Sequence, residues 1–229
     1  MNLKTRLVAL ACVTVVAAGM AVPASADDAK VDKAMVAEKQ VPKSFGTPTS
    51  REFVAKAEDK QIVACENAKG DVLVGTPAPV TQFSVTIEMR NKKTFTEVNE
   101  KVFVFDTAAQ ATDAFNQLFN NLGTCSGSTT LKQPPDITDT ITSGSYPGGE
   151  YADFWVNVGS VGRGGECTKP CRTVTQSVFV QAGRSIIQTW AYINGKGQLT
   201  GKQRNDLADL AEELAAPWRN SKGMLLMMM

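Results

Sequence analysis

The chain has 229 residues, with 24 Lys and Arg against 23 Asp and Glu, and it contains no histidine. This charge balance argues against a nucleic-acid-binding protein, which depends on clustered basic residues, and against an electrostatic membrane patch. Without histidine the chain cannot build Ser-His-Asp or Cys-His catalytic sites or a histidine-ligated metal hydrolase, and it lacks the usual general base near neutral pH.

Residues 1–26 have the organisation of a secretory signal peptide. Lys4 and Arg6 precede an apolar run of about 14 residues, which is too short to span a bilayer, and a small-x-small motif ends at Ala26. A lipid anchor at Cys12 is disfavoured, because only about five apolar residues precede it and no leucine stands three positions upstream. We therefore expect cleavage after Ala26 and a secreted chain without a transmembrane segment, whose 22 Lys and Arg nearly balance 23 Asp and Glu.

The exported chain has a length that suits one domain with a sizeable core. We assign residues 27–60 to a partly helical N-terminal segment, residues 61–218 to a single α+β domain and residues 219–229 to a methionine-rich tail. The pattern of the first segment predicts a short helix, with Met35 and Val36 partly buried.

Two strands are predicted before the first well-signalled helix. Residues 82–90 (QFSVTIEMR) alternate apolar and polar side chains, which is typical of a strand with one buried and one solvated face. Residues 100–106 (EKVFVFD) lack this alternation, which predicts a strand buried on both faces. We expect an antiparallel sheet with the helices packed mainly on one of its faces.

A helix is predicted over residues 107–123. Thr107 and Gln110 have the spacing of a capping box, in which each side chain bonds to the backbone amide of the other residue. Gly123 is expected to end the helix. An apolar face at helical spacing is formed by Ala111, Phe115, Leu118, Phe119 and Leu122.

Residues 150–158 (EYADFWVNV) predict another alternating strand, with Phe154 and Val156 on one side. Trp155 then points to the opposite face of the sheet. It is either an exposed contact residue or a residue covered by a helix, and we favour the covered position.

Residues 173–194 predict a β-hairpin closed at Gly183, because glycine suits the first position of a tight turn between twisted strands. The last helix is predicted to begin at Thr200, which forms a capping pair with Gln203, and to end at Pro217. We assign its leucine stripe to core packing rather than to a ligand pocket.

Four cysteines remain after export: Cys65, Cys125, Cys167 and Cys171. An even number in an oxidising compartment predicts two disulfides. A zinc site is disfavoured because only one pair is tightly spaced and no histidine completes it. A redox switch is disfavoured because a strand, not an activating helix, follows Cys171. Of the three possible pairings we favour Cys65–Cys125 with Cys167–Cys171, because the Lys-Pro between Cys167 and Cys171 can form a turn. The other two pairings remain open.

Two glycine-rich stretches, residues 143–151 and 158–166, are interpreted as surface turns. Arg163 could hold a phosphate or carboxylate there, but neither stretch opens a helix after a strand, as nucleotide-binding loops do. Acids near bulky groups, Asp153 and those of residues 136–140, leave a carboxylate-based hydrolase open. Their spacing does not predict a shared cleft.

The chain resembles the PknH-type extracellular sensor domain over residues 100–127, residues 171–194 and the final amphipathic helix. This actinobacterial family is found on a receptor Ser/Thr kinase and in secreted or lipid-anchored proteins. The similar features are a strand leading into FDTAAQA, a cysteine just past the helix, a later Cys-Arg that opens a hairpin, and a closing helix. The resemblance covers about residues 60–215 and implies a single α+β domain with two disulfides and a cleft for a small ligand. Leu122 or Gly123 replaces the family's tryptophan before the post-helix cysteine, and no ligand-contact residue can be transferred.

These observations favour a secreted, non-catalytic ligand-binding or sensor-type domain of the cell envelope. The alternatives are a secreted hydrolase with carboxylate acid and base residues, or an envelope protein-interaction module without a small-molecule pocket. We expect no cofactor, a monomer, and an unidentified small molecule or envelope component as partner. A concave site with converging polar groups would favour the first function, and a shared pair of carboxyl groups the second. A flat apolar patch would favour the third.

Overall fold

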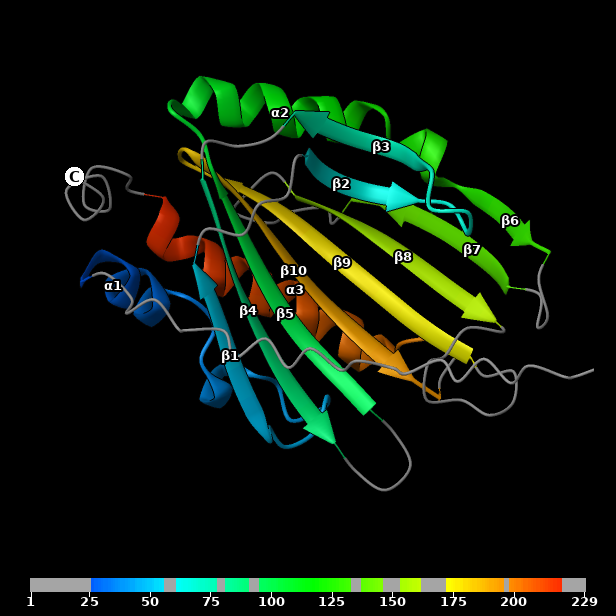
Figure 1. The fold of residues 1–229 in the computed structure, drawn as a ribbon, viewed down its shortest axis with the longest axis horizontal. Helices are drawn as coiled ribbons and strands as arrows, with labels where there is room; N and C mark the ends of the chain where they lie inside the picture. The colour runs from blue at the N-terminus through cyan, green and yellow to red at the C-terminus, as the bar shows by residue number, and fades with distance from the viewer. Residues whose placement is uncertain are drawn as a thin grey trace, which may run out of the picture.

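The structure is a computed structural model that describes residues 26–55, 61–77, 81–90, 95–132, 137–145, 153–161, 172–195 and 198–219. These residues form an eight-stranded antiparallel sheet, a separate two-stranded hairpin and three α-helices, which confirms the α+β class (Figure 1). The α-helices are α1 (Ala26–Ala34), α2 (Ala108–Asn120) and α3 (Gly201–Ala215). The strands are β1 (Ser50–Ala55), β2 (Gln61–Glu66), β3 (Val72–Pro77), β4 (Thr81–Arg90), β5 (Phe95–Val104), β6 (Gly127–Leu131), β7 (Ile137–Gly144), β8 (Asp153–Val161), β9 (Arg172–Ala182) and β10 (Ser185–Asn194). No helix in these ranges is long and apolar enough to cross a membrane.

The large sheet has the strand order β1-β4-β5-β10-β9-β8-β7-β6, and all its neighbouring pairs run antiparallel. The hairpin predicted over residues 173–194 is confirmed, because Ala182 pairs with Ser185 across a turn in which Gly183 has φ +57°. A backbone in this left-handed region favours glycine. The predicted alternation of β4 is also confirmed, since its inward positions are the buried Phe83, Val85, Ile87 and Met89.

The central strands are apolar on both faces, so each face needs a covering layer. Val98, Val102 and Val178 pack on one side with α1 and α3. Phe103 and Phe179 pack on the other side with α2 and the β2–β3 hairpin. Figure 1 shows α2 and this hairpin on one side of the sheet and α3 on the other. Two of the three α-helices, α1 and α3, therefore share one face, as expected, whereas α2 covers the other, because strands buried on both sides need cover on both.

The N-terminal segment joins the large sheet and its core. Met35 and Val36, which the sequence predicts to be only partly buried, follow α1 and are 1% and 0% exposed. Strand β1 then pairs with β4 at the edge of the sheet. Arg51 on β1 donates from Nε to the Val36 carbonyl oxygen at 2.8 Å and forms an ion pair with Asp32 of α1 at 2.7 Å. These contacts fasten α1 to the strand that follows it.

A buried carboxyl group holds the turn after α1 against the sheet. Glu100 on β5 is 0% exposed, and its Oε2 accepts the Val36 N–H at 2.6 Å. Burial raises the pKa of Glu100 to about 8, although the Val36 N–H and the charge of Arg51 act in the opposite direction. Glu100 is therefore mostly protonated at neutral pH, and the folded chain keeps a proton that the unfolded chain releases at lower pH.

Helix α2 begins as the sequence predicts. Thr107 Oγ1 accepts the Gln110 N–H at 3.2 Å, and Gln110 Oε1 accepts the Thr107 N–H at 3.0 Å. Gly123 does not end the helix, because α2 gives way before it to a 3-10 helix over Leu122–Cys125. Phe119 is 40% exposed, so the buried face of α2 is narrower than the predicted apolar face.

A disulfide joins Cys65 on β2 to Cys125 at the end of the 3-10 helix after α2, and this is the first pair of the favoured pairing. Of the two disulfides expected, the described residues contain this one, while Cys167 and Cys171 lie outside them. The bond uses two of the four thiols that a four-cysteine zinc site would need. Across the described ranges, no group of three or more Cys, Asp or Glu side chains is placed to hold a metal ion.

The stability of the fold should decrease as the pH rises from about 5 to 8. Between pH 4.5 and 8 the folded chain binds one more proton at Glu100 than the unfolded chain does. This group should therefore lower the free energy of unfolding by up to about 1.4 kcal/mol per pH unit. Urea unfolding at several pH values should show a weaker decline for Glu100→Gln, whereas Glu66→Gln, at an exposed position, should follow the wild type. Equal slopes for the wild type and Glu100→Gln would contradict this assignment.

Loss of the Cys65–Cys125 disulfide should destabilise the chain without changing its strand order. The two cysteines are 60 residues apart in the sequence. Closing a loop of that length in the unfolded chain stabilises the fold by about 4 kcal/mol in the chain-entropy account. Urea unfolding should show a loss of this size in the double variant Cys65→Ser, Cys125→Ser. A double variant as stable as the oxidised wild type would refute the prediction.

Candidate functional site

A groove of about 490 Å³ lies between α3 and the part of the sheet formed by β7, β8 and β9; we call it the α3 groove. Helix α3 packs mainly against β9 and β10, which leaves the groove beside it. The volume falls within the range of about 300–1,000 Å³ that is usual for small-molecule pockets. The described lining residues are Thr140, Thr142, Trp155, Asn157, Gly159, Gln176, Gln198, Leu199, Arg204 and Asn205.

Cross-strand register brings three polar side chains together on the floor of the α3 groove. Thr142 on β7 pairs with Asn157 on β8, which pairs in turn with Gln176 on β9. Directly opposite residues point to the same face of an antiparallel sheet, so these side chains stand in one row. Gln176 is only 1% exposed, and Asn157 is half-buried. In the next row Gly159 pairs with Thr140 and has no side chain to fill the floor.

Trp155 stands in the row on the other side of Asn157. Its indole packs against the core under α1 and α3 and also lines the groove. It lies opposite Gly144, where an added Cβ atom would be 2.9 Å from Cζ2 and 3.0 Å from Cε2 of the ring. Glycine is therefore needed for this close approach. The sequence favours a covered Trp155 over an exposed contact residue. In the structure Trp155 is half-buried, because it packs against the core and also borders the groove.

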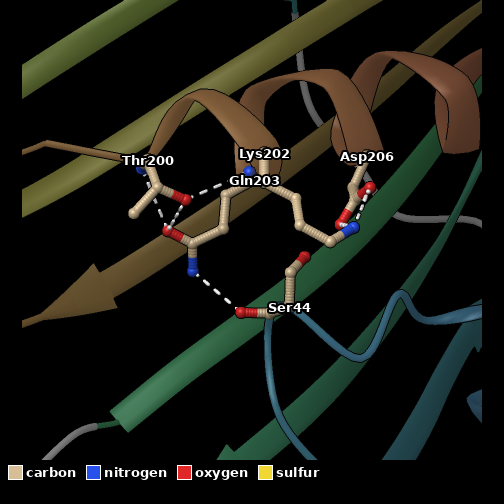
Figure 2. A network of polar contacts seen from close by, with 5 residues as sticks. All are labelled: Ser44, Thr200, Lys202, Gln203 and Asp206. Carbon is tan, nitrogen blue, oxygen red and sulfur yellow. Dashed lines mark hydrogen bonds and ion pairs between the residues drawn. The ribbon is translucent and has the colours of Figure 1, made fainter.

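The first turn of α3 forms a wall of the groove, and a polar network holds it in place (Figure 2). The predicted capping pair is confirmed, because Thr200 Oγ1 accepts the Gln203 N–H at 3.2 Å and Gln203 Oε1 accepts the Thr200 N–H at 3.1 Å. Gln203 Nε2 also donates to the Ser44 carbonyl oxygen at 3.0 Å, which ties α3 to the N-terminal segment. Hydrogen bonds from Lys202 and then Ser44 hold the pKa of Asp206 below its usual value.

Arg204 is the one charged residue among the described residues that line the α3 groove. Its side chain is exposed, and its Nη1 donates to the Leu199 carbonyl oxygen at 3.2 Å. No carboxylate in the described part of the chain lies within ion-pair distance of Arg204. The lining therefore combines one cation with neutral hydroxyl and carboxamide groups.

A second groove, of about 480 Å³, lies on the opposite face of the sheet, next to β2. Lys101 on β5 and Trp190 on β10 line it, together with Glu66 and Cys65 of β2. The Lys101 Nζ lies 5.8 Å from the centre of the Trp190 ring, a cation–π distance. Because Lys101 already covers the Trp190 ring that a ligand would contact, we take the α3 groove as the candidate site.

Of the acids considered for a carboxylate mechanism, Asp139 and Asp153 do not meet, and Asp136 lies outside the described residues. Asp139 on β7 pairs with Ser160 on β8. Ser160 is seven residues along β8 from Asp153. At about 3.3 Å per residue, this places the two carboxyl groups roughly 23 Å apart along the sheet. Alternation along the strand also puts them on opposite faces. Neither lines the α3 groove, and Arg163, the anion-binding candidate, lies outside the described residues.

Local sequence patterns identify no binding residue, and neither the row of floor side chains nor Arg204 was predicted from them. Gln176 interrupts the alternating apolar positions Val174, Val178 and Val180 of β9, and Asn157 stands between Val156 and Val158 on β8, which are visible but weak signals. Whether the two point to the same face of the sheet depends on the register of β8 against β9, which local patterns leave undetermined. Arg204 follows the capping residue Thr200 by one turn, but the sequence does not show that this turn borders a groove.

The fold is similar to that of a solved structure, the extracellular domain of PknH from Mycobacterium tuberculosis. The TM-score is 0.52 at 13% sequence identity, over 80% of this chain and 93% of that chain. This likeness confirms the resemblance to the PknH-type domain at the level of the fold. A second solved structure is LpqN, described as involved in cell envelope biogenesis of M. tuberculosis. It matches with a TM-score of 0.25 and 10% identity, over 75% of this chain and 84% of that chain. A TM-score this low carries no argument about the fold. No protein-family model and no curated protein matches the chain.

Substituting Gly144 by Ala should displace the Trp155 indole. The added methyl group overlaps the ring, and overpacking of this kind costs about 1–3 kcal/mol of stability. In a ¹H–¹⁵N spectrum, the Trp155 indole N–H signal should move while that of Trp190 stays in place. Gly123→Ala is the matched control, because nothing lies within 4 Å of its Cβ position, and it should change neither signal. An unmoved Trp155 signal in Gly144→Ala would contradict the close approach.

Proposed function

We propose that this protein is an exported, non-catalytic binding domain of the cell envelope that takes a small polar molecule in the α3 groove. The observation that carries the proposal is the convergence of polar side chains from β7, β8, β9 and α3 on one concave site of about 490 Å³. Small-molecule sites usually combine a concave shape with a few converging polar groups.

The positions of these groups are set before a ligand arrives. The floor side chains stand on three hydrogen-bonded strands, and the wall is held by the bond between Gln203 and Ser44. A site on paired strands and a capped helix loses little conformational freedom on binding, which favours affinity. Such a rigid frame supports recognition of one ligand rather than adaptation to many.

The envelope location rests on two observations about the chain. Residues 1–26 have the pattern of a cleavable export signal, and the Cys65–Cys125 disulfide fits an oxidising compartment. The PknH domain with the similar fold is described as extracellular, which agrees with this location. At 13% identity that likeness supports the fold alone. The proposal of a small polar ligand therefore rests on the residues that line the groove.

The two alternative functions have less support from the geometry. A carboxylate-based hydrolase needs two carboxyl groups about 5–9 Å apart in one cleft, and the described lining of the α3 groove contains none. An interaction module without a pocket would offer a flat apolar patch. The exposed large apolar side chains of the described residues, Val54, Val72, Leu73, Phe119 and Val161, are instead divided among β1, β3, α2 and β8.

A thermal-shift screen of the oxidised exported chain against envelope metabolites and glycans tests the proposal. A compound present at a hundred times its dissociation constant should stabilise the fold by about 2.7 kcal/mol. Asn157→Ala should abolish this stabilisation, because it removes a floor side chain of the α3 groove. Gln188→Ala, which removes an amide from the second groove, should preserve it. The proposal fails if no compound raises the melting temperature, or if Asn157→Ala responds like the wild type.

A further inference from the structure

Resting on the proposed function, we infer that the α3 groove binds a hydroxylated ring compound of the carbohydrate class that carries one anionic group, a carboxylate or a phosphate. Three features of the described lining lead to this ligand class: its neutral polar side chains, its one aromatic ring and its one cation. Each feature selects one part of the ligand.

The neutral polar side chains select hydroxyl groups. Four carboxamides and two threonine hydroxyls line the groove: Asn157, Gln176, Gln198, Asn205, Thr140 and Thr142. Each of these groups can both donate and accept a hydrogen bond. A sugar hydroxyl also does both, so a compound with several hydroxyls can satisfy such a lining at many points. No carboxylate stands among the described lining residues to select a cationic ligand.

Trp155 selects the ring. It is the one aromatic side chain in the described lining, and the Gly144 contact fixes where its indole lies. An indole offers a large apolar surface beside a polar N–H group, which suits a ligand that is apolar in one part and polar in another. A sugar ring has this character, because its C–H groups cluster on one face and its hydroxyls project from the rim.

Arg204 selects the anionic group. A guanidinium has five N–H donors, and one nitrogen of Arg204 is engaged by the Leu199 carbonyl oxygen. The remaining donors suit a carboxylate or a phosphate, which a guanidinium can bind through two parallel hydrogen bonds. Because no carboxylate of the described residues pairs with Arg204, a ligand anion does not have to displace one.

The nearby acids of the described residues do not cancel this charge from within the groove. Asp206, two residues after Arg204, is paired with Lys202 at 2.8 Å, and Figure 2 shows these two side chains directed at each other. Asp153, two residues before Trp155 on the same face of β8, is buried and does not line the groove. The anionic group should therefore lie beside α3, with the hydroxylated ring over the floor.

Titration of the oxidised exported chain with four probes tests the inference: glucuronate, glucose 6-phosphate, glucose and inorganic phosphate. The indole N–H signals of Trp155, Trp190 and Trp218 report binding in ¹H–¹⁵N spectra and detect even weak association. Glucuronate or glucose 6-phosphate should shift the Trp155 signal saturably and leave the other two in place. Glucose should bind about tenfold more weakly, because it lacks the charge-assisted bonds to Arg204. The better of the two anionic probes identifies the group as carboxylate or phosphate.

Arg204→Gln should weaken binding of the anionic probe about tenfold, to the level of glucose, and leave glucose binding unchanged. Raising the salt concentration should weaken the anionic probe only, since the ion pair is exposed. Lys69→Gln is the matched control, because it removes a positive charge from an exposed position between β2 and β3, on the opposite face of the sheet, and leaves the Lys202–Asp206 ion pair intact. It should bind all four probes like the wild type.

Failure of the inference and failure of the proposed function give different results. If glucose binds as tightly as the anionic probes and Arg204→Gln has no effect, the anionic group is refuted and the binding function stands. If inorganic phosphate shifts Trp155 as strongly as glucose 6-phosphate, the carbohydrate part is refuted. If no probe moves Trp155 while a different compound from the thermal screen does, the ligand class is wrong. If neither experiment gives binding, the proposed function is lost as well.

Discussion

The central strands of the sheet are buried on both faces, and the rest of the architecture follows from this constraint. Apolar side chains on opposite sides of β5, β9 and β10, such as Val178 and Phe179, each need removal from water. The chain provides two covering layers, one from α1 and α3 and one from α2 with the β2–β3 hairpin. Because α3 packs mainly on β9 and β10, it leaves the α3 groove beside it, over β7 and β8.

The two layers differ in how they are fastened. On the α2 side, the Cys65–Cys125 disulfide joins the hairpin covalently to the end of the helix region. On the α3 side, the fastening is polar: Gln203 binds the Ser44 carbonyl group, and Glu100 receives the Val36 N–H. The covalent staple and the candidate site therefore lie on opposite faces, so the disulfide supports the fold without limiting the chemistry of the groove.

The α3 groove is polar where the sheet beneath its neighbouring helix is apolar. On the same face, β9 changes from buried Val178 under the core to Gln176 in the groove, one row further along. The position of the Gln176 carboxamide at the base of the groove fits a surface that meets a polar ligand. Arg204, the one cation of the described lining, attracts an anionic group to the α3 side of this otherwise neutral surface.

The sequence by itself determined the local elements. The Thr107–Gln110 and Thr200–Gln203 capping pairs, the alternation of β4 and the turn at Gly183 are set by neighbours in the chain, because capping and pleating act over a few residues. Only the tertiary structure decided which face of the sheet each helix covers, and that Asn157, Gln176 and Arg204 border one groove. Those outcomes depend on strand register and helix docking between segments far apart in the sequence, which no local pattern specifies.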